Sequence, residues 1–217
     1  MSNNKLLKYL IFITTLLSFL WLTISVKLIP FFGLDLQISK SIQSINFSGF
    51  AKFMTFISGL GWSLPMYISI GLVSVILFIF KKRVASIFIL LISFIDMVLF
   101  LTLSKIISRP RPDESLIHVD FHISAGGFPS GHVLLYTIIL GFLIYLSYIS
   151  IKSIWIKTTI ISIFLLFIFL VGIARIYSGQ HWPSDVLGAY LLSIITIVPI
   201  IKLYNYIKGL KSFSFLG

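Results

Sequence analysis

Residues 84–104 read VASIFILLISFIDMVLFLTLS, an apolar run in which Asp96 is the one charged residue. A helix needs roughly 20 apolar residues to cross the ~30 Å hydrocarbon core of a bilayer, and this run has that length. The run therefore predicts a transmembrane helix. A carboxyl inside a membrane helix is costly, so we expect Asp96 to pair within a helix bundle or to be protonated, rather than to take part in catalysis.

Five further apolar runs occur along the chain, at residues 6–32, 63–80, 133–151, 154–173 and 186–204. Hydrophobic residues make up 58% of the 217 residues and charged residues 11%, whereas soluble domains carry roughly 25% charged residues. Backbone groups inside a bilayer must satisfy one another, which helices do. The first run lacks a small-residue cleavage site, so we expect an uncleaved span. The sequence predicts an all-α membrane protein with six transmembrane helices in a single domain, residues 1–217.

Two connections between these runs are long, at residues 33–62 and 105–132. The first connection carries apolar residues at helical spacing: Leu36, Ile38, Ile42, Ile45 and Phe47. This pattern predicts a short amphipathic helix at the membrane interface, between the first two spans. The second connection is polar and contains Gly and Pro, which is typical of a loop.

Basic residues predict the orientation, because cytoplasmic connections are enriched in Lys and Arg. Six spans place the larger share of the 17 basic residues on the side of both termini: Lys5, Lys8, Lys81, Lys82, Arg83, Lys152, Lys157, Lys202, Lys208 and Lys211. The other side holds Lys27, Lys40, Lys52, Lys105, Arg109, Arg111 and Arg175. We therefore expect a multi-pass protein of the cell membrane with cytoplasmic termini and outward-facing connections at 33–62, 105–132 and 174–185.

Composition also excludes several functions. The chain contains no cysteine, which rules out disulfides, thiolate catalysis and Cys-ligated metal sites. Its net charge is +11, but the basic residues lie between apolar runs and not in one Lys/Arg-rich tract. We therefore expect a membrane and an anionic lipid as partners, and no nucleic acid.

The first motif on the outward side is Lys105-Ile-Ile-Ser-Arg109-Pro-Arg111-Pro112. Its prolines stop the preceding helix and restrict the backbone, and Arg side chains held in this way are suited to binding an oxyanion. The alternative is that these basic residues only extend from a helix end to the membrane surface.

The second motif, Gly126-Gly127-Phe128-Pro129-Ser130-Gly131-His132, stands directly before an apolar run. Backbone N–H groups at a helix N-terminus bind phosphate, and Gly131 allows a close approach of the backbone. His132 would lie beside the bound group as a proton donor. The alternative is an ordinary helix start capped by Ser130.

The third motif is Arg175-Ile-Tyr-Ser-Gly-Gln-His181-Trp-Pro-Ser-Asp185. An Asp one helical turn after His181 can accept the proton of one ring nitrogen, which leaves the other nitrogen as a nucleophile. The alternative is an interfacial histidine beside the aromatic residue Trp182. A metal site is not expected, because only two ligand-type residues are local and the arginines repel a cation.

Arg111-Pro112, Pro129-Ser130-Gly131-His132 and Arg175-x5-His181-x3-Asp185 resemble, in order and spacing, the signature motifs of the type 2 phosphatidic acid phosphatase (PAP2) family. The resemblance implies that His181 is a nucleophile that forms a phosphohistidine and that Asp185 orients it. It implies that His132 protonates the leaving oxygen, and that no metal or cofactor is required. The phosphate-binding residues that it implies are Arg111, Arg175, Ser130, Gly131 and Lys105.

Two positions depart from the family pattern. The family has a Lys that is separated from Arg-Pro by six intervening residues, and this position is Ser104 in this chain. Lys105 has only five residues between it and Arg111, so it is displaced by about 100° around a helix. The third motif usually begins Ser-Arg, where this chain has Ala174-Arg175. The first departure predicts a less direct contact from Lys105, and the second removes a hydroxyl from the site.

The membrane setting and the resemblance together predict a lipid phosphate or diphosphate phosphatase. Undecaprenyl diphosphate is the first substrate considered, because the site is expected to face outward and the chain is small, and Arg109 could supply a cation for the second phosphate. Phosphatidylglycerophosphate or phosphatidic acid is the alternative. A lipid phosphotransferase remains possible if a lipid acceptor replaces water. A non-catalytic lipid-phosphate carrier is disfavoured by the presence of both histidines, and the haloperoxidases that share the motifs are soluble.

Overall fold

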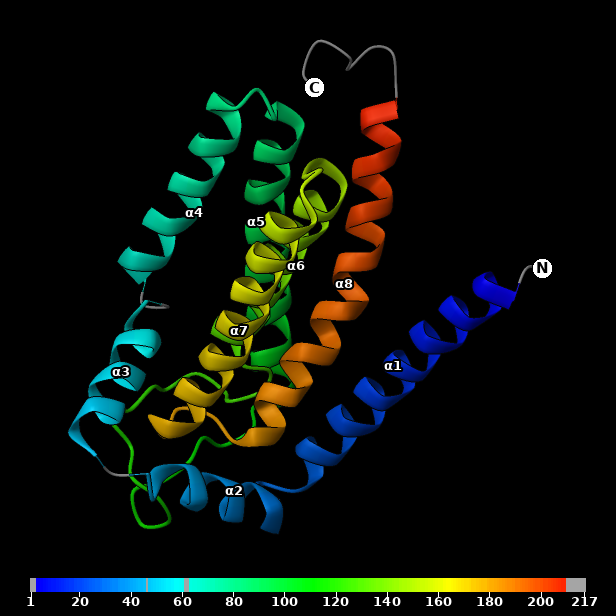
Figure 1. Cartoon of the computed structure of the whole chain (residues 1–217). Helices are drawn as coiled ribbons and strands as arrows, with labels where there is room; N and C mark the ends of the chain where they lie inside the picture. The colour runs from blue at the N-terminus through cyan, green and yellow to red at the C-terminus, as the bar shows by residue number, and fades with distance from the viewer. Residues whose placement is uncertain (1–2, 46, 61–62, 210–217) are drawn as a thin grey trace.

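The apolar runs fold as α-helices in the computed structural model, which describes residues 3–45, 47–60 and 63–209 (Figure 1). Within these ranges the chain forms helices and no β-strand, which confirms the all-α prediction. The helices are α1 (Asn3–Leu28), α2 (Gly33–Gln43), α3 (Ser48–Gly59), α4 (Ser63–Ile79), α5 (Arg83–Ile107), α6 (Gly131–Ser150), α7 (Ile154–Tyr177) and α8 (Pro183–Gly209). Lys211, one of the basic residues used to predict orientation, lies outside the described residues.

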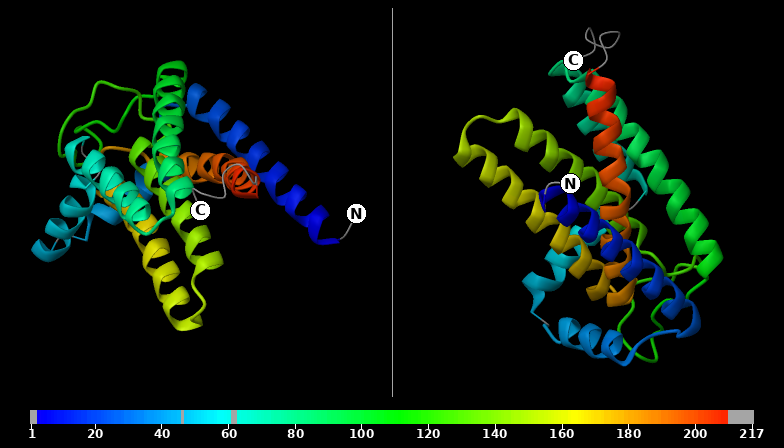
Figure 2. Two further views of the ribbon diagram at one scale, coloured as in Figure 1. Left: turned by 90° about the horizontal axis from the view of Figure 1, so that it is seen from above. Right: turned by 90° about the vertical axis from the view of Figure 1, so that its right-hand side faces the viewer.

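Helix α6 is the centre of the bundle, because it packs against α5, α7 and α8. Its inward face carries the fully buried residues Leu134, Ile138 and Phe142, and an uninterrupted apolar face of this kind is stabilised by packing on neighbours. Helix α1 packs on α8 through its second half and leans away from the bundle toward its N-terminus (Figures 1 and 2).

The outer surface of the bundle is apolar as well. Trp21 on α1 is 69% exposed and Trp155 on α7 is 81% exposed, as expected for side chains that face lipid rather than water. Five helices are long and apolar enough to cross a bilayer, namely α1, α5, α6, α7 and α8, and the number rises to six if α3 and α4 form one bent span. The protein is therefore a multi-pass helical membrane protein, and the sixth span stays a prediction.

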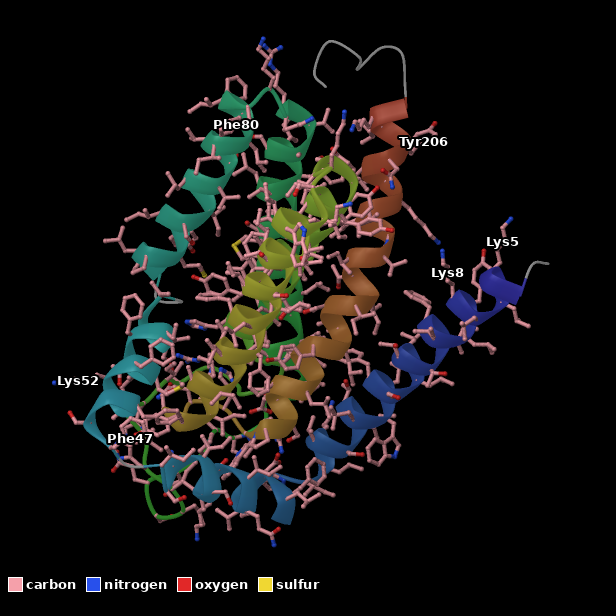
Figure 3. The ribbon with its side chains drawn as sticks, in the orientation of Figure 1. Lys5, Lys8, Phe47, Lys52, Phe80 and Tyr206 are labelled. Atoms are coloured by element: carbon pink, nitrogen blue, oxygen red, sulfur yellow. The ribbon has the colours of Figure 1, made fainter. Side chains whose placement is uncertain are left out.

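The connection at 33–62 contains two helices where the sequence predicts one. Helix α2 contains Leu36, Ile38 and Ile42 of the predicted amphipathic segment and lies across one end of the bundle (Figure 1), whereas Ile45 and Phe47 lie beyond its end. Helix α3, at only 12 residues, is too short to span a bilayer by itself. It packs on α7, with Lys52 pointing away from the bundle (Figure 3).

The loop between α5 and α6 is held at this same end of the molecule by two kinds of contact. Gln43, the last residue of α2, donates hydrogen bonds to the carbonyls of His118 (2.8 Å) and Tyr177 (2.9 Å) and so joins the loop to α7. Phe128 is fully buried and packs directly on α8 at Gly188, where an added Cβ would stand 2.2 Å from the ring. These contacts bring the second motif beside the third.

Candidate active site

A cavity of about 750 Å³ lies between α4, α5 and α6 and reaches the loops that carry the three motifs. Its polar end is lined by Arg111, Gly131, His132, Arg175 and His181, which the sequence predicts as site residues. The remainder is mostly apolar, with residues such as Met66, Ile70, Met97, Leu101 and Leu135. A concave site with a few convergent polar groups at one end of an apolar cavity is suited to a ligand with a charged head and an apolar tail.

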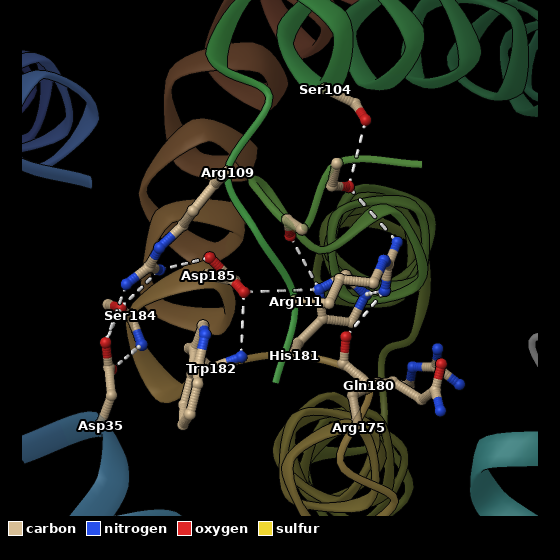
Figure 4. Close-up of polar contacts among 12 residues, drawn as sticks. Asp35, Ser104, Arg109, Arg111, Arg175, Gln180, His181, Trp182, Ser184 and Asp185 are labelled. Atoms are coloured by element: carbon tan, nitrogen blue, oxygen red, sulfur yellow. Dashed lines mark hydrogen bonds and ion pairs between the residues drawn. The ribbon is translucent and has the colours of Figure 1, made fainter. Parts of the chain in front are cut away.

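His181 lies in the turn between α7 and α8, and its ring is held on both sides (Figure 4). Its Nδ1 is 2.8 Å from the carbonyl oxygen of Gly127, and its Nε2 is 3.1 Å from Nη1 of Arg111. A carbonyl only accepts hydrogen bonds, so Nδ1 carries the proton and Nε2 carries the lone pair. This tautomer leaves the lone pair of Nε2 at the polar end of the cavity, which is the arrangement that a nucleophilic histidine requires.

The protonation state of His181 follows from its surroundings. The residue is 1% exposed. Burial lowers the pKa of His181 well below its usual value, and the positive charges of Arg111 and Arg175 lower it further. The imidazole is therefore neutral at physiological pH, as a nucleophile must be. The alternative of an interfacial histidine beside Trp182 is not favoured, since both side chains are buried inside the protein and Trp182 is also only 1% exposed.

Asp185 stands behind His181, but it is not the nearest partner of the ring. Its Oδ2 is 3.6 Å from Nδ1, farther than the Gly127 carbonyl, and it accepts a 2.9 Å hydrogen bond from the backbone N–H of Trp182. The carboxylate sits in the first turn of α8, where this backbone contact and Arg109 hold it. The Gly127 carbonyl therefore fixes the tautomer, and Asp185 is placed to stabilise a positive charge on the ring.

Arg109 is buried and contacts three segments of the chain (Figure 4). Its Nη1 donates to Asp185 and Nη2 donates to Asp35 Oδ2 at 2.9 Å, while Nε donates to the carbonyl of Pro30 at 2.9 Å. Asp35 also accepts hydrogen bonds from the backbone N–H (2.9 Å) and hydroxyl (2.7 Å) of Ser184. Arg109 does not line the cavity, so the suggestion that it binds a second phosphate is corrected, because both carboxylates occupy its guanidinium.

Arg111 is fixed by backbone carbonyls in an orientation that presents it to the cavity. Its nitrogens donate to Ala125 (2.8 Å), Gln180 (2.7 Å) and Gly126 (3.3 Å). Burial lowers the pKa of Arg111 from its ordinary value, and the charge of Asp185 partly opposes this effect. A guanidinium held in one orientation loses little conformational entropy when it binds an oxyanion.

Arg175 is a buried cation of the site with hydrogen-bond donors that an anion could use. It is 1% exposed, and its Nη1 donates to the hydroxyl of Ser58 on α3 at 2.8 Å. Its Nε and Nη2 are buried and have no hydrogen-bond partner within the described ranges. A buried cation with unused donors is costly, and a phosphate in the cavity would satisfy both. This chain has Ala174 where the family has a Ser, so it lacks a hydroxyl at that position. The hydroxyl of Ser58 contacts Arg175 instead.

The N-terminus of α6 forms another wall of the site. Helix α6 begins at Gly131, whose Cα lies so close to Phe100 that an added Cβ would be 2.9 Å from the ring. The backbone N–H of Ser130 donates to the carbonyl of Asp185 at 3.2 Å, so it is not available to a phosphate as expected. The Ser130 side chain is completely buried and is not part of the cavity wall. Gly131 and His132 therefore face the cavity, and Ser130 joins the second motif to the third.

Lys105 is a predicted phosphate-binding residue that the structure does not bring to the cavity. Its side chain is exposed and is not part of the cavity wall. Ser104, at the position where the family has Lys, is buried and donates a 3.1 Å hydrogen bond to the carbonyl of Gly126. The single-residue displacement turns Lys105 away by about 100°, so Arg111 and Arg175 are the cations of the site.

Three contributors to the site are missing from the sequence prediction: Asp35, Ser58 and the carbonyl of Gly127. Asp35 gives a weak signal, since it is an acidic residue within a largely apolar segment. Ser58 and the Gly127 carbonyl give none, because a hydroxyl in a short apolar helix and a backbone group carry no motif. His118 and His122 are exposed loop residues that pair with Asp120 and Glu114 at 3.0 Å, and they lie outside the site.

Comparison with known proteins agrees with this geometry. The profile of the PAP2 superfamily matches residues 84–208. Phosphatidylglycerophosphatase B from Bacillus subtilis (strain 168) is 33% identical over 171 residues, covering 74% of this chain and 78% of that protein.

Two solved structures are similar over most of the chain. The crystal structure of the transmembrane PAP2 type phosphatidylglycerolphosphate phosphatase from Bacillus subtilis has a TM-score of 0.72 and 27% identity, covering 92% of this chain and 98% of that chain. That of Aquifex aeolicus LpxE has a TM-score of 0.64 and 27% identity, covering 80% of this chain and 98% of that chain. The chain therefore belongs to the PAP2 superfamily and is a membrane lipid phosphatase, a hydrolase of phosphoric esters.

Proposed function

We propose that this phosphatase removes the terminal phosphate of phosphatidylglycerophosphate through a phosphohistidine at His181. The observation that carries the mechanism is the neutral His181 ring, with Nδ1 bonded to the Gly127 carbonyl and Nε2 at the cavity beside Arg111. The substrate is supported by the relatives, since the Bacillus subtilis proteins described above are named for phosphatidylglycerophosphate.

In the first step, Nε2 of His181 attacks phosphorus and the bond from phosphorus to the lipid oxygen breaks. His132 transfers its proton to that oxygen, which leaves as the lipid alcohol. Arg111 and Arg175 neutralise the phosphoryl oxygens, and this electrostatic stabilisation dominates phosphoryl transfer. The phosphorylated imidazole is positively charged, and Asp185 stabilises it from 3.6 Å.

In the second step, water attacks phosphorus and the bond from phosphorus to Nε2 breaks. His132, now neutral, takes a proton from the water, so inorganic phosphate leaves and both histidines return to their starting forms. A lipid hydroxyl in place of water would give phosphotransfer. Product analysis with and without an acceptor lipid separates these two outcomes.

Undecaprenyl diphosphate becomes the second candidate on physical grounds. The sequence preference for it rested on an outward-facing site and a small chain, with Arg109 as a possible cation for a second phosphate. Arg109 is instead paired with Asp35 and Asp185 in a buried network. A phosphomonoester matches the two cations that line the cavity, Arg111 and Arg175.

We also propose that the site faces outward from the cell membrane and that both termini are cytoplasmic, within a single domain. The N-terminal end of α1, with Lys5 and Lys8, and the C-terminal end of α8 lie away from α2 and the site (Figures 1 and 3). The basic connection at Lys81–Arg83 lies at that far end too. This charge distribution supports the orientation, since cytoplasmic connections are enriched in basic residues. Accessibility of single cysteines introduced at Ser115 and Lys152 to an impermeant reagent in whole cells tests it.

The decisive experiment measures phosphate release from a panel of lipid phosphates in detergent with EDTA present. We expect wild-type activity to survive EDTA and the His181→Ala variant to lose at least 10³-fold in rate. His118→Ala, which removes an exposed loop histidine, serves as the matched control and should keep wild-type activity. Full activity of His181→Ala, or loss of activity in EDTA, contradicts the proposed mechanism.

A further inference from the structure

One carboxyl lies in the apolar part of the cavity, and the mechanism above does not use it. Asp96, in the middle of α5, is part of the cavity wall and is 7% exposed. Its Oδ1 has no hydrogen-bond partner, and it makes no ion pair, within the part of the chain that the structure describes. A carboxyl buried without a partner costs free energy, and one inside a membrane helix is a functional candidate.

The depth of Asp96 indicates which part of a lipid it would meet. Phe100, one helical turn later on α5, packs against Gly131 at the phosphate end of the cavity. A four-residue step along a helix is roughly 6 Å, so Asp96 lies one turn beyond the phosphate-binding end. A lipid with its phosphate at His181 would place the groups next to that phosphate, not the ends of its tails, near Asp96.

The side chains around Asp96 in the cavity wall are mostly apolar. Met97 and Leu101, which follow Asp96 on α5, and Ile70 of α4 are apolar. Ser93, one turn before Asp96, already donates its hydroxyl to the carbonyl of Ile89 at 2.9 Å. Asp96 is therefore the acidic side chain of this wall, and its natural partner is an oxygen function carried by the substrate.

We propose that Asp96 is a specificity-determining residue that hydrogen-bonds an oxygen of the substrate's glycerol unit and so selects glycerolipid phosphates over polyprenyl phosphates. The inference rests on the proposed function, because it requires the phosphate to be bound at His181. Glycerolipids carry a hydroxyl or ester carbonyls near the phosphate. A polyprenyl chain offers only hydrocarbon there, and would leave the carboxyl without a partner.

The test is a competition between dioleoyl phosphatidic acid and farnesyl phosphate in the same detergent micelles. The ratio of the two kcat/KM values does not depend on how much enzyme is folded, so a poorly folding variant still gives an answer. We expect Asp96→Leu to lower the preference for phosphatidic acid about tenfold or more, as for a lost buried hydrogen bond. Asp96→Asn, which keeps hydrogen-bonding groups, should stay near wild type, and Ser93→Ala should leave the ratio unchanged.

Two more lipids identify the oxygen. If the partner is an ester carbonyl, the effect of Asp96→Leu vanishes with dialkyl-ether phosphatidic acid. If the partner is the headgroup hydroxyl, the effect appears with phosphatidylglycerophosphate and is absent with phosphatidic acid. An Asp96→Leu variant whose rates on all four lipids fall by one common factor, or do not fall, overturns the proposal. His181→Ala in the same assay tests the proposed function separately, because its full activity would contradict the mechanism whatever Asp96 does.

Discussion

Arg109 Nη1 donates a hydrogen bond to Asp185 Oδ1, and neither side chain is accessible to solvent. The same guanidinium contacts Asp35 on α2 at 2.9 Å. Helix α2, at the end of the bundle, is thus connected through Arg109 to Asp185, the carboxylate beside His181. Breaking a buried ion pair leaves an uncompensated charge. The position of Asp185 therefore depends on Asp35, which lies outside all three motifs.

Asp35→Asn tests this connection. The amide keeps an acceptor for Ser184 but removes the negative charge that balances Arg109. We expect the free energy of unfolding to fall by about 1–3 kcal/mol, and kcat to fall as Asp185 loses its fixed position. The measurements are thermal unfolding in detergent and the rate of phosphate release. Asp113→Asn, in the exposed loop, is the control, and equal behaviour of the two variants would show that the connection is unimportant.

Arg175→Lys examines the anion-binding part of the site. Lysine keeps a positive charge but cannot reproduce the planar guanidinium, with one nitrogen on Ser58 and two unused donors at the cavity. We expect kcat/KM to fall about 10²–10³-fold, as for loss of one donor to a transition-state oxyanion. Inhibition by vanadate should weaken in parallel. Lys52→Gln on neighbouring α3 removes an exposed charge and should change neither value.

The pH dependence of kcat/KM should follow His181. Burial and the charges of Arg111 and Arg175 depress the pKa of His181, so the nucleophile stays neutral below the ordinary histidine pKa of about 6.5. Replacing Arg111 with Gln removes one of these positive charges, so the acid limb of the profile should move to higher pH. The second ionisation of the substrate phosphate is common to both enzymes and cancels in the comparison. A limb that moves to lower pH would contradict the assignment.

The lowered pKa of His181 also affects the stability of the folded protein. The unfolded chain protonates this histidine near pH 6.5, whereas the folded protein resists protonation until lower pH. The unfolded state therefore binds more protons below about pH 6.5, and the contribution of His181 to stability is lost progressively as the pH falls from about 6.5 toward the lower pKa of the folded state. Thermal unfolding of wild type and His181→Gln between pH 5 and 8 should show a smaller acid loss in the variant.

Gly188→Ala tests how the second motif is placed against α8. An added Cβ would lie 2.2 Å from the ring of Phe128, which is completely buried and cannot move aside cheaply. We expect lower activity and a lower melting temperature, with partial recovery in the double variant Gly188→Ala/Phe128→Leu. Gly71→Ala is the matched control, because nothing lies within 4 Å of its added Cβ. Equal effects of the two single alanine substitutions would contradict the packing role.

Lys105→Ala should have little effect. The side chain is exposed and lies outside the cavity wall, and surface substitutions of this kind change free energies by about 0.5 kcal/mol or less. We therefore expect kcat/KM on lipid phosphates to stay within about twofold of wild type. A loss comparable to that of Arg175→Lys would mean that Lys105 reaches the phosphate during turnover.

Much of the fold and of the site was predictable from the sequence because the relevant signals are local. Long apolar runs give the all-helical membrane fold, since the bilayer sets the length of a span. The motifs at Arg111, His132 and Arg175 to His181 identify the cavity-lining groups, because prolines, glycines and helix starts fix the nearby backbone. The direction of Lys105 is also local: the rotation per residue of a helix turns it away from the direction in which a lysine at position 104 would point.

Tertiary structure decided what depends on contacts between distant segments. The proton position on His181 is fixed by the carbonyl of Gly127, the charge of Arg109 is taken up by Asp35, and Arg175 meets a hydroxyl on α3. No sequence pattern specifies these pairs, because a buried polar group is satisfied by whichever partner the packing brings within reach. The sequence therefore determined the residues that we propose for the phosphate chemistry, and the packed structure determined which of them line the cavity and in what charge state.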